Sequence, residues 1–283
     1  MGYSILSISG GEPFLYKDLK KLVNEAKEFG YYVQLVSNGM LFNSARNNEI
    51  LNCIDSIALS IDGMEVLHNF IRKSDNAFQK LLEGIEILNQ LNIEFGLIHT
   101  VTSKSWKQIP ELIEFAIEHK AKLLQFHPIE RTGRAIEELN NEYDLTEDEL
   151  YRIYILTNII KETTDDIKIH LDLLHQKNLN EDLKCSDDIY NSLLSKIVIT
   201  ESGSVIPISY GFSKYFEIHN IYDTNKRTFD FYKETNLIAL NEIVNKSIRK
   251  IREEKISLFN WTEIMVNQSQ DITQHYDRIT PTS

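Results

Sequence analysis

The sequence contains only two cysteines in 283 residues, which excludes a small fold built on a framework of disulfide bonds. It has no apolar run of the roughly 18–20 residues that a membrane-spanning helix needs. The net charge of −12 leaves no excess of lysine and arginine, so we expect no general nucleic-acid surface. The N-terminus lacks the basic start and cleavage site of a secretory signal. These absences predict a cytoplasmic protein with no membrane or nucleic-acid partner.

What the sequence does contain begins at its N-terminus, where an apolar stretch stops at two glycines, a glutamate and a proline. Residues 3–13 read Tyr-Ser-Ile-Leu-Ser-Ile-Ser-Gly-Gly-Glu-Pro. Two adjacent glycines let a ligand approach bare backbone, and Pro13 stiffens the exit. Glu12 places a negative charge at the end of a predicted strand, where α/β folds bind their ligands. The loop suits an ammonium group, whereas Gly10-Gly11 alone would indicate only an ordinary strand–turn–helix corner.

Strands and helices alternate over the first 128 residues. Short apolar runs of strand length alternate with stretches in which apolar residues recur every three or four positions. We expect strands at residues 3–9, 31–37, 54–61, 93–101 and 122–127, and helices at 16–30, 43–53, 77–91 and 109–119. The short links between them predict parallel βαβ units, and therefore an α/β fold.

After residue 128 this alternation stops. Residues 129–149 are rich in Asp and Glu, which indicates a solvated connecting region. Thr146 and Glu149 have the spacing of a capping box, and we expect the helix that they open to reach about residue 162. The other expected elements are a strand at 168–173, a hairpin at 196–210 with its turn at 201–204, and a helix at 237–253. The last dozen residues are polar, and we expect them to be frayed.

Several predicted strands of the first part end in polar or glycine-containing turns, such as Asn38-Gly39 and Asp62-Gly63. Each dipeptide alone indicates a turn, and Arg72 alone would be a solvated surface charge. His99 and His127 lie on predicted strands and are expected to be hydrogen-bonded core histidines rather than ligands. Polar ends on four successive strands, all on the carboxyl side, are nevertheless what a ligand-binding barrel face requires.

Together these motifs resemble the radical S-adenosylmethionine (SAM) superfamily, in the order in which that family has them. Residues 9–13 look like its GGEP loop, which holds the methionine amino group of SAM. Residues 37–39 and 60–63, Ser-Asn-Gly and Ser-Ile-Asp-Gly, resemble its Thr-Asn-Gly and Ser-Leu-Asp-Gly turns. Residues 133–135, Gly-Arg-Ala, resemble the segment that closes the barrel in the same branch. The resemblance runs from about residue 3 to residue 135, and more weakly to about residue 225.

The resemblance implies a partial (β/α)6 TIM-like radical SAM barrel that binds SAM and acts on a peptide or protein. In the family, the residues matching Ser60 and Asp62 approach the ribose and methionine part of SAM, and the arginine matching Arg72 approaches its carboxylate. The SAM-binding residues implied in this sequence are Gly10, Gly11, Glu12, Pro13, Ser37, Asn38, Ser60, Asp62 and Arg72. No catalytic residue and no metal ligand is assigned.

The C-terminal part resembles a small, degenerate form of the SPASM or twitch extension found in peptide- and protein-modifying members. Residues 196–207 look like the hairpin of that module, and residues 217–221 like the Gly-Asn-Ile that follows it. Cys185 falls near the first cysteine of the module, but Ile208 stands where the module normally has a cysteine ligand. The organisation expected is a barrel at 1–135, a connecting segment and hairpin at 136–225, and a helix with a polar tail at 226–283.

The thiolates that the family needs are missing from this sequence. Radical SAM enzymes hold a [4Fe–4S] cluster with three cysteines of a Cys-x-x-x-Cys-x-x-Cys motif, which follows the first strand of the barrel. Here the chain starts at what matches the second strand, and its two cysteines, Cys53 and Cys185, lie 132 residues apart (185 − 53). Cys53 is expected to be a buried structural thiol. We therefore expect no cluster binding and no reductive cleavage of SAM by this chain.

Two accounts fit this pattern. The chain can be a fragment of a longer peptide-modifying enzyme, which the position of Met1 immediately before an apolar strand favours, since that strand would otherwise be an aggregation-prone edge. It can also be a degenerate barrel that now binds a peptide or a partner protein, which the lost cysteines of the extension favour. A third reading, a flavodoxin-like or TIM-like metabolic enzyme, would need phosphate-binding glycines late in the barrel, and the sequence has none.

Overall fold

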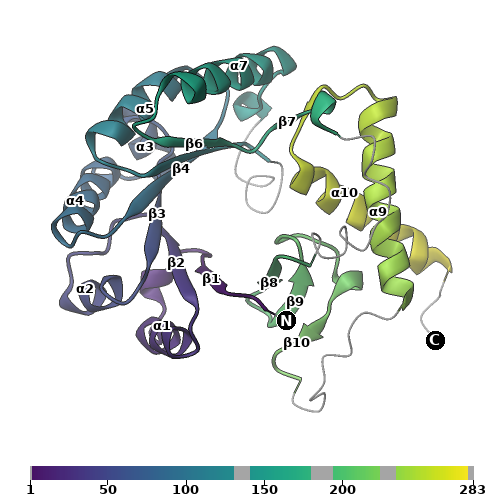
Figure 1. Cartoon of the computed structure of the whole chain (residues 1–283), viewed down its shortest axis with the longest axis horizontal. Helices are drawn as coiled ribbons and strands as arrows, with labels where there is room; N and C mark the ends of the chain where they lie inside the picture. Colours follow the sequence, from purple (N-terminus) through teal and green to yellow (C-terminus); the bar gives the residue numbers. More distant parts are fainter. Residues whose placement is uncertain (1, 131–140, 180–193, 224–233, 280–283) are drawn as a thin grey trace. The chain divides into compact units, whose positions relative to one another are not determined.

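The computed structural model describes residues 2–130, 141–179, 194–223 and 234–279 (Figure 1). The chain divides into two compact units, Met1–Ile129 with Leu139–Asp172, and Glu130–Glu138 with Leu173–Ser283. The boundaries predicted at residues 135 and 225 and the Gly-Arg-Ala at 133–135 lie outside the described residues. None of the helices in the described ranges is long and apolar enough to cross a membrane.

The first unit alternates strands and helices as the periodicity predicts. Its strands are β1 (Ile5–Ile8), β2 (Tyr32–Ser37), β3 (Ser56–Ser60), β4 (Phe95–Val101), β5 (Leu123–Pro128) and β6 (Lys168–Leu171). Its helices are α1 (Leu19–Glu28), α2 (Ala45–Leu51), α3 (Glu65–Arg72), α4 (Ala77–Gln90), α5 (Ile109–Glu118) and α7 (Glu147–Thr163). The strands form one six-stranded sheet in the order β1-β2-β3-β4-β5-β6. Every neighbouring pair is parallel, so the predicted parallel α/β sheet is confirmed.

Burial alternates along the central strands of this sheet, and the alternation separates its two faces. On β2, for example, Val33, Leu35 and Ser37 are buried while Gln34 and Val36 are partly exposed. Successive side chains of a strand point to opposite faces, so one face carries the core and the other stays more open. In Figure 1 the helices α1, α2, α4, α5 and α7 lie along the same side of the sheet. We call the opposite, more open side the inner face.

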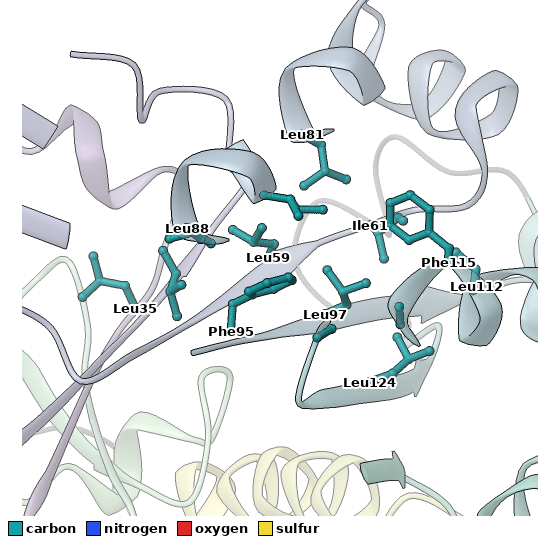
Figure 2. Packing of buried hydrophobic residues seen from close by; sticks show 14 of the residues in the cluster. Leu35, Leu59, Ile61, Leu81, Leu88, Phe95, Leu97, Leu112, Phe115 and Leu124 are labelled. Carbon is teal, nitrogen blue, oxygen red and sulfur yellow. The ribbon is translucent and has the colours of Figure 1, made fainter. Parts of the chain in front are cut away.

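The core of the first unit lies between the sheet and these helices. Figure 2 shows leucines of four adjacent strands meeting apolar side chains of α4 and α5. The labelled residues, all buried, are Leu35, Leu59, Ile61, Leu81, Leu88, Phe95, Leu97, Leu112, Phe115 and Leu124. Burying one such side chain fully contributes about 1.5–3 kcal/mol, so this layer fixes the positions of the strand ends.

The predicted capping box opens α7. The Thr146 hydroxyl accepts a hydrogen bond from the Glu149 backbone amide at 3.3 Å, and the Thr146 backbone amide donates to the Glu149 carboxylate at 2.9 Å. Each of these bonds satisfies a donor that the first turn of a helix leaves free. The Trp106 indole also donates to the Glu149 carboxylate, at 2.9 Å. This cap therefore ties the start of α7 to the segment between β4 and α5.

In its described residues the second unit contains two small antiparallel sheets, β10-β9-β8 and β11-β7, and two long helices. Its strands are β7 (Leu174–His175), β8 (Ile197–Ile199), β9 (Ser204–Pro207), β10 (His219–Asn220) and β11 (Leu258–Phe259), and its helices are α9 (Glu234–Glu253) and α10 (Trp261–Ile279). The predicted hairpin is confirmed, because β8 and β9 pair antiparallel. The likeness of this hairpin to a SPASM or twitch module remains a prediction, and Cys185 lies outside the described residues.

Helix α10 was not among the predicted elements, and it extends into the last dozen residues, which were expected to be frayed. Its first half packs on α9 through Met265 and Val266, which share a cluster with Ile243 and Val244 of α9. The buried Ser269 hydroxyl accepts a hydrogen bond from the Ser213 backbone amide at 3.0 Å. The helix needs few apolar residues because its buried small polar side chains form hydrogen bonds. A hydropathy pattern does not reveal such hydrogen-bonded pairs.

Candidate functional site

The turns that follow β1, β2 and β3 bring most of the predicted site residues to one edge of the sheet. These three strands are parallel neighbours, so their carboxyl ends lie side by side. Neighbouring strands are about 4.8 Å apart, so the three turns span roughly 10 Å. The sequence predicts this grouping from the spacing of the turns alone.

Glu12 is fixed by hydrogen bonds from uncharged donors. Its carboxylate accepts from the Ser37 hydroxyl at 2.9 and 3.1 Å, from the Asn38 backbone amide at 2.9 Å and from the Phe14 backbone amide at 3.2 Å. Among the described residues no lysine, arginine or histidine forms an ion pair with it. The partly exposed carboxylate is thus held in place without a counter-charge, an arrangement that favours an external cation.

The glycines before Glu12 leave the backbone open to a ligand. Gly10 has a φ of +130°, and no atom lies within 4 Å of the position that a side chain would take at Gly10 or Gly11. Pro13 is buried and begins a short 3-10 helix, Pro13–Leu15, whose first free amide is bound by Glu12. Pro13 therefore helps to fix the direction of the loop.

The Ser37-Asn38-Gly39 turn serves mainly to hold this loop. Ser37 is buried, and its hydroxyl accepts from the Gly39 amide at 3.1 Å while donating to Glu12. The side-chain oxygen of Asn38 accepts from the Met40 amide at 2.9 Å. Gly84 of α4 packs directly on the turn, because a Cβ there would lie 2.4 Å from the Gly39 carbonyl oxygen. Ser37 thus acts on Glu12 rather than pointing into open space.

Asp62 and Arg72 meet after β3. The Arg72 Nε donates to the Asp62 carboxylate at 2.5 Å, whereas its two Nη groups have no hydrogen bond within the described ranges. Buried His68 accepts a hydrogen bond from the Asp62 backbone amide at 3.1 Å. Burial, opposed in part by Asp62, lowers the pKa of His68 to about 4, so this imidazole is neutral at pH 7. Ser60 lies partly exposed on the inner face, two residues before Asp62.

The two histidines expected to lie in the core have different surroundings. His99 is fully buried and contacts the Ile61 carbonyl oxygen at 2.7 Å and the Ser105 hydroxyl at 3.0 Å. Its role as a hydrogen-bonded core histidine is therefore confirmed. His127 does not follow the expectation, because its side chain is 36% exposed and its ring contacts the carboxylate of Asp172, which follows β6.

His170 and Asp172 were not predicted as site residues. His170 on β6 contacts the Asp172 carboxylate through Nε2 at 2.7 Å. The two residues are separated by one position in a predicted strand, so a pattern of period two could have placed them on one face. What the sequence does not reveal is that this face lies beside His127.

The described residues do not fit an iron–sulfur cluster. No group of three or more His, Cys, Asp or Glu side chains in the described ranges could hold a metal ion. Cys53 is only partly buried, at the end of α2, and its thiol donates to the Glu49 carbonyl at 3.2 Å. The two cysteines of the sequence cannot supply the three thiolates that the cluster requires.

Comparison with known proteins agrees with this fold. The model of the radical SAM superfamily matches residues 1–116. This match covers less than half of the chain. The structure of SuiB from Streptococcus suis superposes with a TM-score of 0.62 at 20% identity, and covers 81% of this chain and 55% of SuiB. The structure of anSMEcpe with bound AdoMet (SAM) and the Kp18Cys peptide superposes with a TM-score of 0.58 at 19% identity, and covers 88% of this chain and 74% of that one. The radical SAM partial-barrel class of the fold is thereby confirmed.

One curated relative is named for the synthesis of a porphyrin rather than for a peptide. The Fe-coproporphyrin III synthase of Methanosarcina barkeri (strain Fusaro / DSM 804) is 26% identical over 147 residues, which are 52% of this chain and 37% of that protein. The matched region therefore spans well under half the length of this relative.

Proposed function

We propose that the first unit binds SAM through the α-amino acid end of that molecule. The observation that carries this proposal is the Glu12 carboxylate, which three neutral donors fix and no cation of the described residues neutralises. An ammonium group beside it would gain charge-assisted hydrogen bonds, each contributing roughly 1.5–3 kcal/mol when desolvated. The backbone at Gly10 and Gly11 would contact the same group.

In this proposal Arg72 receives the carboxylate of SAM. Its Nε is engaged by Asp62, which leaves the Nη edge of the guanidinium to form two parallel hydrogen bonds with a carboxylate. Asp62 orients this arginine and, with Ser60, would face the ribose end. Glu12 follows β1, and Arg72 ends α3 and is bound to the turn after β3, so the two opposite charges lie at the same edge of the sheet. An amino acid zwitterion has the matching pair of charges. Without a cluster iron to chelate, SAM should bind weakly, with a Kd of roughly 0.1–1 mM.

We further propose that the ligand presented to this SAM half-site is a peptide or a protein. The fold neighbours SuiB and anSMEcpe support this, since anSMEcpe is seen with a peptide, although the fold itself does not specify a substrate. In a longer enzyme that supplies the three thiolates the unit would take part in peptide modification. Alone, it would act as a peptide- or partner-binding barrel.

A second candidate is binding of a tetrapyrrole. It is favoured by the sequence relative whose name is Fe-coproporphyrin III synthase. The net charge of −12 counts against it, because the several carboxylates of a coproporphyrin would be repelled by an acidic surface. The peptide proposal predicts instead a preference for basic peptides.

A titration of SAM followed by ligand-observed NMR tests the half-site. Glu12→Gln and Arg72→Ala should each weaken binding by about 10- to 150-fold, which takes the Kd of either variant to roughly 1 mM or above, at or beyond the limit of detection. Arg152→Ala removes an arginine whose side chain is 60% exposed on α7, and should leave the affinity unchanged. 5′-Methylthioadenosine, which lacks the α-amino acid part, should bind the wild type more weakly than SAM. Undiminished SAM binding by Arg72→Ala would show that the carboxylate site is misplaced.

The ligand class is tested separately. A basic peptide, its acidic counterpart and Fe-coproporphyrin III are titrated against the same protein, by fluorescence anisotropy for the peptides and by Soret absorbance for the porphyrin. The peptide proposal expects the basic peptide to bind best. Saturable one-to-one binding of the porphyrin without binding of either peptide would favour the second candidate.

A further inference from the structure

A second group of polar side chains lies on the inner face of the same sheet, on β5 and β6. Gln125 and His127 lie two residues apart on β5, and His170 and Asp172 lie two residues apart at the end of β6. Gln125 is the register partner of His170, and continuing this register pairs His127 with Asp172. The four side chains therefore occupy adjacent positions of two neighbouring strands.

The Asp172 carboxylate is the centre of this group. One of its oxygens contacts His127 Nδ1, the other contacts His170 Nε2 at 2.7 Å, and the Gln125 amide donates to it at 3.4 Å. Burial acts to raise the pKa of Asp172, but the hydrogen bonds and charges of His127 and His170 lower it more, so its pKa lies below the ordinary value. Asp172 is therefore a carboxylate anion at neutral pH.

This contact determines which nitrogen of His127 carries the proton. A carboxylate only accepts hydrogen bonds, so His127 Nδ1 must be the donor. In the neutral ring the lone pair then lies on Nε2. No residue of the described ranges hydrogen bonds to Nε2, and the His127 side chain is 36% exposed. A purely structural link between β5 and β6 would need only Nδ1, whereas here the second nitrogen is also available.

His127 lies at the same level of the sheet as the proposed SAM half-site. Thr100 of β4 is the register partner of His127, and the β3–β4 register continued by two residues brings Asp62 level with Thr100. Asp62 and His127 are thus two strands apart, roughly 10 Å. The exposed Thr100 side chain lies between them on the inner face. A ligand beside the half-site would be within reach of Nε2.

We propose that His127 is a proton acceptor for a substrate bound at this edge, and that Asp172 is its positioning residue. The substrate group is one with an acidic X–H bond: a thiol, a hydroxyl or a protonated amine. That bond breaks, its electron pair stays on X, and the proton passes to His127 Nε2 and from there to water. The proposal rests on the proposed function for the location of the substrate, but the reactivity of the imidazole can be measured without SAM.

The first test is the tautomer of His127, read from the ring ¹⁵N shifts and the long-range ¹⁵N–¹H couplings of the full chain at pH 7.5. In the wild type the ring proton should lie on Nδ1, which faces Asp172. Asp172→Asn removes the anion, so the ratio of the Nδ1–H tautomer to the Nε2–H tautomer of His127 should fall by about tenfold. Asp172→Glu should restore it. Asp148→Asn, which removes an equally charged surface carboxylate of α7, should leave it unchanged.

The second test is acylation by diethyl pyrocarbonate, which attacks through an unprotonated, accessible imidazole nitrogen. Trypsin releases His127 in the peptide 123–131, where it is the only histidine, so mass spectrometry can follow it directly. The wild type should react at His127 Nε2, and Asp172→Asn should react about tenfold more slowly at this site. His119, which follows α5 and is partly exposed, has no hydrogen bond or ion pair with Asp172 in the described structure and is the internal control for reagent and access.

Several outcomes would overturn the proposal. A His127 ring protonated at Nε2 in the wild type would do so, and so would a His127 that stays unmodified while His119 is acylated. Equal rates in the wild type and in Asp172→Asn, with both folded by circular dichroism, would remove the positioning role of Asp172. None of these outcomes depends on whether SAM binds, so the two proposals fail independently.

Discussion

Acidification should destabilise the first unit through His68, an imidazole that the fold keeps neutral. Its side chain is 1% exposed, Nδ1 accepts a hydrogen bond from the Asp62 amide, and Nε2 is buried with no hydrogen-bond partner in the described structure. Burial is the main cause that lowers its pKa, opposed by the charge of Asp62 and assisted by that of Arg72. Protonation would place a positive charge on a buried side chain.

The size of the effect follows from the two pKa values. The ordinary value is 6.5 and the folded value is about 4, so the unfolded chain binds the proton first. A difference of this size corresponds to about 3 kcal/mol at most. Because the folded pKa is depressed, this stability is fully present above pH 6.5 and is lost as the pH falls toward 4. At pH 5 about 2 kcal/mol should already be lost.

The measurement is urea unfolding of the first unit at several pH values between 7.5 and 4.5. In a Trp261→Phe background, Trp106 is the only tryptophan left and reports on the first unit. The comparison is with His68→Asn in the same background, because the Asn oxygen can accept the Asp62 amide but does not titrate. His99, whose pKa burial also lowers, is present in both proteins and cancels.

The informative quantity is the pH dependence rather than the absolute stability. His68→Asn leaves a small cavity, and this lowers the free energy of unfolding at every pH by a similar amount. The wild type should lose about 2 kcal/mol more than the variant between pH 7 and pH 5. Equal pH dependence of the two proteins would refute the reasoning, since it would mean that His68 binds its proton equally well when folded.

Three further predictions concern the cofactor, the turn and the core. After anaerobic reconstitution with iron and sulfide, Mössbauer spectra should show no stable [4Fe–4S] cluster, and a stoichiometric cluster would contradict the two-cysteine argument. Gly84→Ala should destabilise the first unit by about 1–2 kcal/mol in urea unfolding and weaken SAM binding in the NMR titration, because its Cβ would press on the Gly39 carbonyl. The control Glu83→Ala, on the exposed face of α4, should change neither the stability nor the SAM affinity. Leu97→Ala should cost about 2–5 kcal/mol in urea unfolding, whereas Leu15→Ala, which is 71% exposed, should cost under about 1 kcal/mol.

The sequence by itself determined the architecture of the first unit. Apolar runs and three-to-four residue periodicities locate strands and helices because a buried strand and an amphipathic helix need different patterns. The capping box at Thr146 and the hairpin of β8 and β9 were predictable for a similar reason, since their signals are local. Helix α10 was missed because its first half contributes few apolar residues, Met265 and Val266, to the cluster with α9, and the buried Ser269 is held by a hydrogen bond from Ser213 instead.

For the site, the sequence determined which residue types stand at the strand ends, and the tertiary structure decided what they do. Glycines and carboxylates after parallel strands must gather at one edge, so the grouping of Glu12 with Asp62 follows from order alone. That Ser37 is buried and holds Glu12 depends on two turns meeting in space. The pairing of His127 with Asp172 depends on a register set 45 residues along the chain (172 − 127). Such contacts are set by the packing of whole strands, and no local pattern encodes them.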